Sequence, residues 1–363
     1  MPRSRHARRP ETFRADPSNI DRIGTEGMRM DEFFVTNSLC APSRATFYTG
    51  LYSHMHGVTT NGAGEAFRNQ GGLRDGQETF MSLLHDAGYE TALVGKWHLR
   101  STPAGFDSWV ILPGGGGPYF DPPMNANGVH VRMRGHADDV VGDQTIEYLQ
   151  NRSKDRPFMM LMNFKSPHRN WYPAKRFENA FEGVEIPLPR TYEDRLDTDA
   201  LKRAQMAIAN MPDFKDRGVS PDLPRDERKR RNYEALVKNY YRTILSVDEN
   251  VARALEYLDK NDLAKNTVVV FTSDNGPDYD HCARKHRGLR SAKWKLIEYW
   301  EQPIEYELYD LEKDPDETKN LASSKAPLVR ELKSRMDQLR HDLGEVDAPG
   351  PVPAVGPCTP RTL

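Results

Sequence analysis

Apolar residues in this chain recur at helical spacing in some segments and form short continuous runs in others. Between Phe80 and Ala87 they fall at i, i+3, i+4 and i+7, which predicts an amphipathic helix that ends at Gly88. Residues 90–97 then form a mostly apolar run that predicts a buried strand. A helix followed by a strand, with a glycine between them, is typical of a layered α/β fold.

Further runs extend this pattern along the chain. Residues 32–37 predict a short strand, and the continuous apolar runs 157–164 and 267–272 are typical of central strands. Residues 139–150 suit a helix, and apolar steps of three and four predict the longest helix over residues 236–258.

Between these elements the composition changes. The Gly- and Pro-rich segment 112–128 predicts a loop, and the charged segment 172–231 predicts short helices and long loops. Residues 294–300 and 306–311 predict two antiparallel strands, and residues 326–343 an amphipathic helix.

The expected organisation is a parallel or mixed α/β domain followed by a small α+β unit. We expect a disordered arm at residues 1–18, a catalytic α/β domain at 19–288, a small C-terminal subdomain at 289–345 and a disordered tail at 346–363.

Composition argues against several classes of function. The net charge of −2 over 363 residues does not favour nucleic-acid binding, and no apolar run approaches the length of a membrane span. Three cysteines, Cys40, Cys282 and Cys358, cannot build a disulfide framework.

Cys40 stands at a predicted helix start, because Pro42 is tolerated in a first turn and Ser43 can cap one. A helix N-terminus attracts anions and lowers the pKa of a thiol, and Arg44 adds a positive charge. The alternative interpretation is a buried structural cysteine.

Other polar groups follow predicted strands. Lys96 and His98, two residues apart, point to the same face and could meet an anionic substrate. His168 follows the run 157–164, and Asp274 with Asn275 follows the run 267–272, where their oxygens suit a hard cation. Each has a structural alternative, but together they indicate a metal-assisted enzyme acting on a tetrahedral anionic ester.

The motifs resemble the sulfatase family. Residues 40–44 read Cys-Ala-Pro-Ser-Arg, and Thr49-Gly50 follows, as in the family signature. Segments 19–27, 88–99, 105–107, 273–276 and 307–317 match in the family's order, so the resemblance runs from about residue 16 to 345. Residues 165–171 and 186–194 look most like N-acetylglucosamine-6-sulfatase and mucin-desulfating members.

The resemblance implies an alkaline-phosphatase-like fold, with a mixed sheet between helices and a small C-terminal subdomain. It implies that a maturating enzyme oxidises Cys40 to formylglycine, whose hydrate attacks the sulfur of a sulfate ester. Arg44 would hold the hydrate and His98 assist it, while Lys96 and His168 bind the sulfate. Asp274 and Asn275 would ligate Ca²⁺ with the modified Cys40. The substrate would be a sulfated carbohydrate or an aryl sulfate.

Two features depart from the family pattern. No apolar strand ending in two aspartates precedes the signature, so we expect a weakened calcium site and a shortened sulfatase that folds marginally. Only about a dozen residues separate Gly276 from Arg287, and Lys285 is the candidate for the family's second sulfate-binding lysine.

Three alternatives stay open. The chain could be an inactive sulfatase remnant or a phosphoryl ester hydrolase of the same superfamily. A redox or zinc protein built on Cys40, His281 and Cys282 is disfavoured, because no Cys-x-x-Cys motif is present. Family members usually work in the periplasm, in the lysosome or outside the cell. The residues do not decide the localisation of this chain, which lacks a recognisable signal peptide.

Overall fold

The computed structural model describes residues 19–61, 72–190, 192, 208, 214–275, 286–299 and 304–345. The chain divides into two compact units. The first comprises Met1–Pro187 and Pro212–Asp278, and the second comprises Leu188–Met211 and Tyr279–Leu363. The expected arm at 1–18, the expected tail at 346–363 and Lys285 lie outside the described residues.

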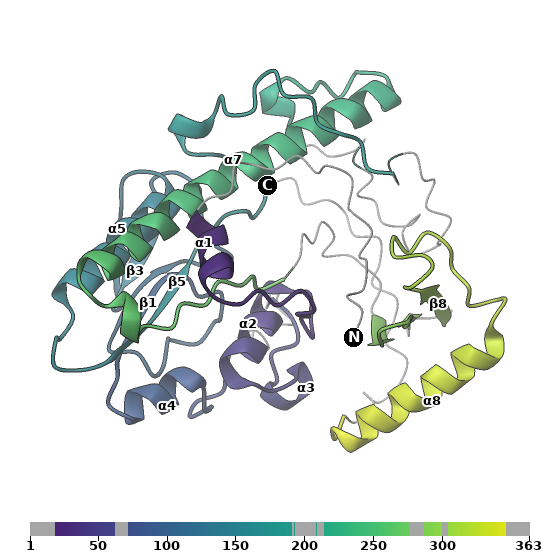
Figure 1. Ribbon diagram of the computed structural model, residues 1–363, viewed down its shortest axis with the longest axis horizontal. Coiled ribbons are helices and arrows are strands. Elements are labelled where there is room, and N and C mark those ends of the chain that lie inside the picture. Colours follow the sequence, from purple (N-terminus) through teal and green to yellow (C-terminus); the bar gives the residue numbers. More distant parts are fainter. Residues whose placement is uncertain are drawn as a thin grey trace. The chain divides into compact units, whose positions relative to one another are not determined.

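The first unit is built on a mixed sheet, of which Figure 1 labels β1, β3 and β5. Its strand order is β4-β3-β2-β1-β5. β1 (Glu90–Lys96) pairs in parallel with β2 (Ser108–Leu112) and with β5 (Phe158–Asn163). β3 (Pro123–Ala126) and β4 (Val129–Arg132) extend the sheet as an antiparallel hairpin. The expected strand at 90–97 and the expected mixed α/β architecture are thereby confirmed.

Helices cover both faces of this sheet. Leu93 of β1 packs with Ala45 of α2 (Cys40–Thr49) and Met81 of α4 (Phe80–Asp86). Alternate residues of β2 point the other way, where Leu112 packs with Val140 of α5 (Ala137–Asn151). The remaining helical elements of this unit are α1 (Asn19–Glu26), α3 (Ser53–His56), α7 (Arg225–Lys260) and the short turns η2 (Lys175–Phe177), η4 (Lys215–Arg217) and η5 (Ala264–Asn266).

The long helix α7 packs against α5 (Figure 1), and polar side chains join the two helices. It confirms the predicted long helix and begins eleven residues earlier than the apolar stripe indicated, at Arg225. Asn250 is buried and donates from Nδ2 to Asp139 Oδ1 at 2.9 Å. A Cβ at Gly142 would lie 1.9 Å from Asn250 Oδ1, so only a glycine lets the two helices approach here.

Two predicted strands are wrong. Residues 32–37 and 267–272 form no strand, and Val268 is 90% exposed. A strand exists through hydrogen bonds to a neighbour, and neither segment pairs with another within the described residues. Because neither segment pairs with β5, this strand is the last in the described order of its sheet, although it was expected to be central.

The predicted loop at 112–128 is also partly wrong, because it contains β3. Met124 is buried in this strand, and the turn to β4 runs through Asn127 and Gly128, both with positive φ. An Asn-Gly pair between two short strands is a strong hairpin signal that the density of glycine and proline concealed. In α4 the helix is confirmed, but Met81 is its buried residue and Leu83 is 52% exposed.

The second unit contains an antiparallel sheet and one helix. β6 (His286–Arg290), β7 (Trp294–Tyr299) and β8 (Glu305–Asp310) form the sheet, and α8 (Ala326–Asp342) packs on β6 and β7. Leu296, Leu308 and Leu332 form its core. The predicted strand pair and helix are confirmed, and β6 is a third strand. No helix in the described parts of the chain meets the length and apolarity needed to cross a membrane.

Gly95 fixes how β1 meets β5. Its φ is +99°, and a Cβ built on it would lie 1.9 Å from the carbonyl oxygen of Asn163. Any side chain would push the two strands apart immediately before Lys96.

We therefore predict that Gly95→Ala lowers the free energy of unfolding by roughly 2–5 kcal/mol, through backbone strain and overpacking. Gly24→Ala is the matched control, because its Cβ would meet nothing closer than 3.9 Å and a helical alanine is favoured. Urea unfolding measures both variants, and equal stability of the two would contradict the argument.

Candidate functional site

Cys40 is the first residue of α2 and is buried. The first backbone N–H groups of a helix have no partner within the helix. The side chain of Asn61 satisfies one of them, since its Oδ1 accepts from Ala41 N at 2.9 Å. The predicted helix start is confirmed, but the predicted capping role of Ser43 is wrong. Ser43 lies inside the helix, and its hydroxyl donates to the carbonyl oxygen of Asp274.

Arg44, Lys96 and Asp274 form a buried charge cluster beside Cys40. Arg44 donates from Nε to Asp274 Oδ2 at 2.9 Å and from a terminal nitrogen to Lys96 O at 2.7 Å. Lys96 is 3% exposed, with Nζ 3.7 Å from Asp274 Oδ2. Burial alone would raise the pKa of Asp274, but the charges of Arg44 and Lys96 hold it below its ordinary value.

The same groups act on the thiol. Burial alone would raise the pKa of Cys40, but a hydrogen bond with His98 and the charge of Lys96 lower it to about 7. Burial lowers the pKa of both Lys96 and His98. The structure thus brings together five of the residues singled out from the sequence, Cys40, Arg44, Lys96, His98 and Asp274, and it does so at the carboxyl end of β1.

His98 keeps one unused polar atom. Its Nδ1 is buried and has no hydrogen-bond partner within the described residues. The Gly-rich loop after β2 lies against it, because a Cβ at Gly115 would come within 3.4 Å of His98 Nε2. Gly116, at φ +125°, passes so close to Lys96 and Lys165 that a side chain there would contact both.

Lys165 is a site residue that the sequence analysis missed. It is buried two residues after the end of β5, and its Nζ lies 4.6 Å from the centroid of the Tyr119 ring. Burial and the nearby charge of Lys96 lower its pKa to about 8. Its position just past a parallel strand was the available signal, since ligands bind at that edge of such sheets.

His168 lies within the electrostatic reach of this cluster. Burial and the charge of Lys96 lower its pKa to about 4, so the ring is neutral near pH 7. Its Nδ1 lies 2.7 Å from Arg169 O, which assigns the ring proton to Nδ1. The free Nε2 can donate only after the ring takes up a second proton.

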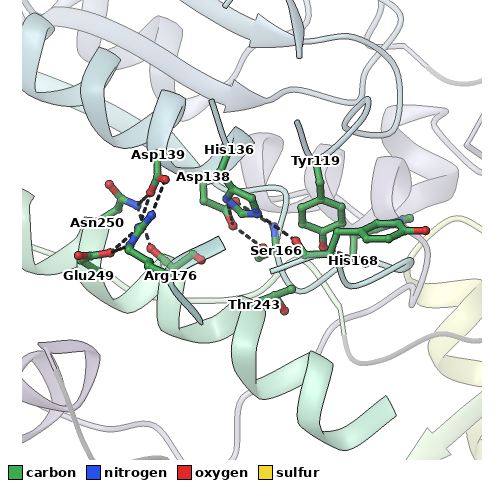
Figure 2. A network of polar contacts seen from close by, with 12 residues as sticks. Tyr119, His136, Asp138, Asp139, Ser166, His168, Arg176, Thr243, Glu249 and Asn250 are labelled. Carbon is green, nitrogen blue, oxygen red and sulfur yellow. Dashed lines mark hydrogen bonds and ion pairs between the residues drawn. The ribbon is translucent and has the colours of Figure 1, made fainter. Parts of the chain in front are cut away.

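A buried polar network holds the loop that carries Lys165 and His168 (Figure 2). Asp138 is fully buried at the start of α5 and accepts from Ser166 N at 3.2 Å and from the Ser166 hydroxyl. The Tyr119 hydroxyl donates to the carbonyl oxygen of His168. Burial raises the pKa of Asp138, and the nearby His136 opposes that effect.

The same end of α5 is tied to its neighbours by an ion-pair cluster (Figure 2). Arg176 donates to both oxygens of Asp139, at 2.8 and 2.7 Å, and to Glu249 Oε2 at 2.6 Å. Together with the bond from Asn250 to Asp139, these contacts link η2, α5 and α7. These contacts hold the start of α5, from which Asp138 binds Ser166 of the loop after β5.

The described residues do not make a calcium site by themselves. No group of three or more His, Cys, Asp or Glu side chains in the described chain is arranged to hold a metal ion. Asp274 Oδ2 already faces Arg44 and Lys96, and Asn275 N donates to Asp274 Oδ1 at 3.1 Å. Asp274 and Asn275 fall short of the roughly six to eight oxygens that Ca²⁺ takes.

Comparison with known proteins gives a consistent result. The family model described as Sulfatase matches residues 11–301, and that of the C-terminal region of N-sulphoglucosamine sulphohydrolase matches residues 273–342. An N-acetylglucosamine-6-O-sulfatase of Bacteroides thetaiotaomicron is 36% identical over 304 residues, which cover 71% of this chain and 53% of the relative. An N-acetylglucosamine-6-sulfatase of Capra hircus is 27% identical over 277 residues, covering 70% of this chain and 46% of the relative. The chain therefore spans about half the length of these curated relatives.

Solved structures agree on the fold. A protein solved in complex with its substrate D-glucosamine-2-N,6-O-disulfate matches with a TM-score of 0.78 at 26% identity, over 91% of this chain and 93% of that one. A phosphonate monoester hydrolase of Agrobacterium radiobacter matches with a TM-score of 0.59 at 15% identity, over 90% of each chain. The second likeness shows the fold alone.

We predict that alkylation of unmodified Cys40 rises with pH through a midpoint near 7, since the thiolate reacts. Lys96→Met should move this midpoint upward, because it removes a charge that favours the thiolate. Iodoacetamide labelling in a Cys282→Ala, Cys358→Ala background isolates Cys40. A midpoint near 9, the ordinary value for a thiol, would contradict the described surroundings.

We also predict that this chain binds Ca²⁺ weakly, with a dissociation constant above roughly 1 mM. Its melting temperature should be the same in EDTA and in micromolar Ca²⁺, and Asp274→Asn should not alter that insensitivity. A rise in melting temperature at micromolar Ca²⁺ that Asp274→Asn abolishes would show that Asp274 exchanges its cationic partners for the metal.

Proposed function

This chain belongs to the sulfatase family, and we propose that it hydrolyses sulfate esters of amino sugars at the site around Cys40. Sulfatases generally use a formylglycine and Ca²⁺. The proposal assigns the reaction to the first unit, which contains the described residues of the site.

One observation carries the proposal: a cysteine at a helix N-terminus is surrounded by a buried excess of positive charge. Arg44, Lys96 and Lys165 contribute three cations, and Asp274 is the carboxylate among them. Burying like charges together costs free energy that an anionic ligand can offset. A sulfate ester, which is tetrahedral and singly charged at its sulfur end, matches that requirement.

The surroundings of Cys40 also fit a formylglycine at that position. The hydrate of that group supplies one hydroxyl to attack sulfur and a second whose deprotonation expels sulfate. Here Arg44 would hold the hydrate oxygens, and His98 would accept or return their protons, with its unpartnered Nδ1 able to carry one. A sulfatase-maturating enzyme is the partner that this modification requires.

We propose that Lys96, Lys165 and His168 bind the sulfate oxygens. Lys96 and Lys165 both lie near Gly116, where a Cβ would come within 3.6 Å of Lys165 and 3.9 Å of Lys96, so the missing side chain leaves space beside both. A bound anion favours protonation of His168, and its Nε2 can then donate to sulfate. Lys285, the other candidate sulfate ligand from the sequence, lies outside the described residues.

The finer proposal is that the sulfate is the 6-O-sulfate of an N-acetylglucosamine or glucosamine unit. It rests on the names of the curated relatives from Bacteroides thetaiotaomicron and Capra hircus and on the substrate named for the matching structure. The signature cysteine favours sulfate over phosphate, since phosphoryl hydrolases of this superfamily more often use threonine or serine.

We predict that the protein, co-expressed with a formylglycine-generating enzyme, releases sulfate from N-acetylglucosamine-6-sulfate. Cys40→Ala should abolish turnover, and Lys96→Met should lower kcat/KM by roughly 10²–10³-fold, as expected when one preorganised charge is lost. Cys358→Ala and Lys260→Met, which make the same changes elsewhere, should leave the rate unchanged.

Mass spectrometry of the same sample measures the modified fraction of Cys40. Turnover that survives Cys40→Ala would place the reaction elsewhere. A fully modified Cys40 without release of sulfate from either N-acetylglucosamine-6-sulfate or an aryl sulfate would identify the chain as an inactive relative.

A further inference from the structure

A cavity of about 530 Å³ lies in the first unit between α7 and the chain that follows His168. Pockets of roughly 300–1,000 Å³ accommodate small organic ligands. Its lining includes Tyr172 and Pro173 and residues of α7 from Arg231 to Arg242. None of these residues belongs to the Cys40 site.

The lining is rich in positive charge. Among the described residues, Arg217, Arg231, Lys238 and Arg242 line the cavity together with two carboxylates, Glu178 and Glu234. Glu234 is already engaged, because its Oε1 accepts from Lys238 Nζ at 2.5 Å. The cavity therefore presents more cationic than anionic groups.

Arg242 is the cation with most capacity left for a ligand. In the described part of the chain, its one hydrogen bond runs from Nε to Ala180 O at 2.7 Å. Burial lowers its pKa, Glu182 raises it, and the charge of Arg217 lowers it again. Two guanidinium groups that line the same cavity and repel each other are stabilised when an anion binds between them. Guanidinium binds carboxylate or sulfate oxygens through two parallel hydrogen bonds.

Aromatic rings give the same cavity an apolar surface. The Arg217 guanidinium stacks 4.2 Å from the Tyr172 ring centroid and donates to Asn170 O at 2.6 Å. Phe120 also lines the cavity and leaves 44% of its surface exposed. A ligand that combines an anionic group with a compact ring matches this lining, as aromatic faces and a few polar groups are typical of small-molecule sites.

One aromatic contact connects the cavity lining to residues near the Cys40 site. The ring of Tyr172 lies 6.2 Å from the ring of Tyr119, centroid to centroid, and Tyr119 in turn contacts Lys165 Nζ and the carbonyl oxygen of His168. The loop from Lys165 to Tyr172 therefore has sulfate-site residues at one end and a cavity residue at the other.

We propose that this cavity binds an anionic sugar unit adjacent to the sugar whose sulfate is removed, with Arg242 holding its carboxylate or sulfate group. The inference rests on the proposed function, because it takes the reacting sugar to lie at the Cys40 site. The chain would then select sulfated glycans with a charged neighbouring unit over isolated monosaccharides.

Calorimetric binding tests the cavity without requiring turnover. The probes are an unsulfated disaccharide of glucuronic acid and N-acetylglucosamine, its neutral counterpart with glucose, and a counterpart with a sulfated hexose in place of the glucuronic acid. We expect an anionic disaccharide to bind more tightly than the neutral one, and Arg242→Gln to weaken it roughly tenfold or more by removing a charge-assisted hydrogen bond.

Arg242→Lys should recover part of the affinity, and Lys260→Gln, on the same helix, should leave it unchanged. The disaccharide that binds more tightly, with the carboxylate or with the sulfate, identifies the anion that the cavity takes. Either preference supports the proposal if Arg242→Gln abolishes it. Equal binding of all three disaccharides, or an anion preference that Arg242→Gln leaves intact in a variant with unchanged melting, would overturn it.

Binding of N-acetylglucosamine-6-sulfate separates this result from the proposed function. Lys96→Met should weaken binding of that monosaccharide, and Arg242→Gln should not. For the unsulfated glucuronic acid disaccharide, Arg242→Gln should weaken binding, and Lys96→Met should not. If Lys96→Met does not weaken binding of the monosaccharide but Arg242→Gln weakens binding of the disaccharide, the proposed sulfate site is wrong and the cavity proposal stands. If Lys96→Met weakens binding of the monosaccharide but Arg242→Gln does not weaken binding of the disaccharide, the cavity proposal is wrong.

Discussion

The architecture of the first unit depends on the burial of Lys96 at the end of β1. An ammonium group with 3% exposure is costly unless opposite charge lies nearby, and in the described chain Asp274 supplies it at 3.7 Å. Gly95 lets β1 approach β5 immediately before this lysine. Arg44 then ties the start of α2 to both Asp274 and the backbone of Lys96, so the position of Cys40 follows from the same charge.

The loop after β5 is the second element that this arrangement requires. It carries Lys165 and His168 into an already positive region, so its conformation must be held against repulsion. Asp138 fixes its first turn through Ser166, and Arg217 binds the carbonyl oxygens of Asn170 and Trp171 near its end. One buried carboxylate and one guanidinium thus support a loop that places the Lys165 ammonium group near the like charge of Lys96.

Much of the site could be predicted from local sequence, because its residues follow strand ends and a helix start. Cys40, Lys96 and His98 were found this way. Lys165 and Asp138 were missed, since their importance comes from burial between elements that are distant in sequence. The strands predicted at 32–37 and 267–272 were wrong for the opposite reason. The apolar character of these segments is local, whereas a strand needs a partner strand that composition does not reveal. The polar contacts of α7 with α5 likewise depend on Asp139 and Asn250 meeting across 111 positions of sequence.

The electrostatics around Cys40 serve both the unmodified and the modified residue. Positive groups that lower the thiol pKa to about 7 also stabilise negative oxygen atoms at the same place. In the unmodified chain the thiolate and a bound sulfate therefore compete for Lys96. Raising the pH through 7 fills the site with its own negative charge and weakens its attraction for anions. Replacing the ionisable thiol with an uncharged aldehyde hydrate removes that competition, so modification frees the cations of the site for a sulfate ester.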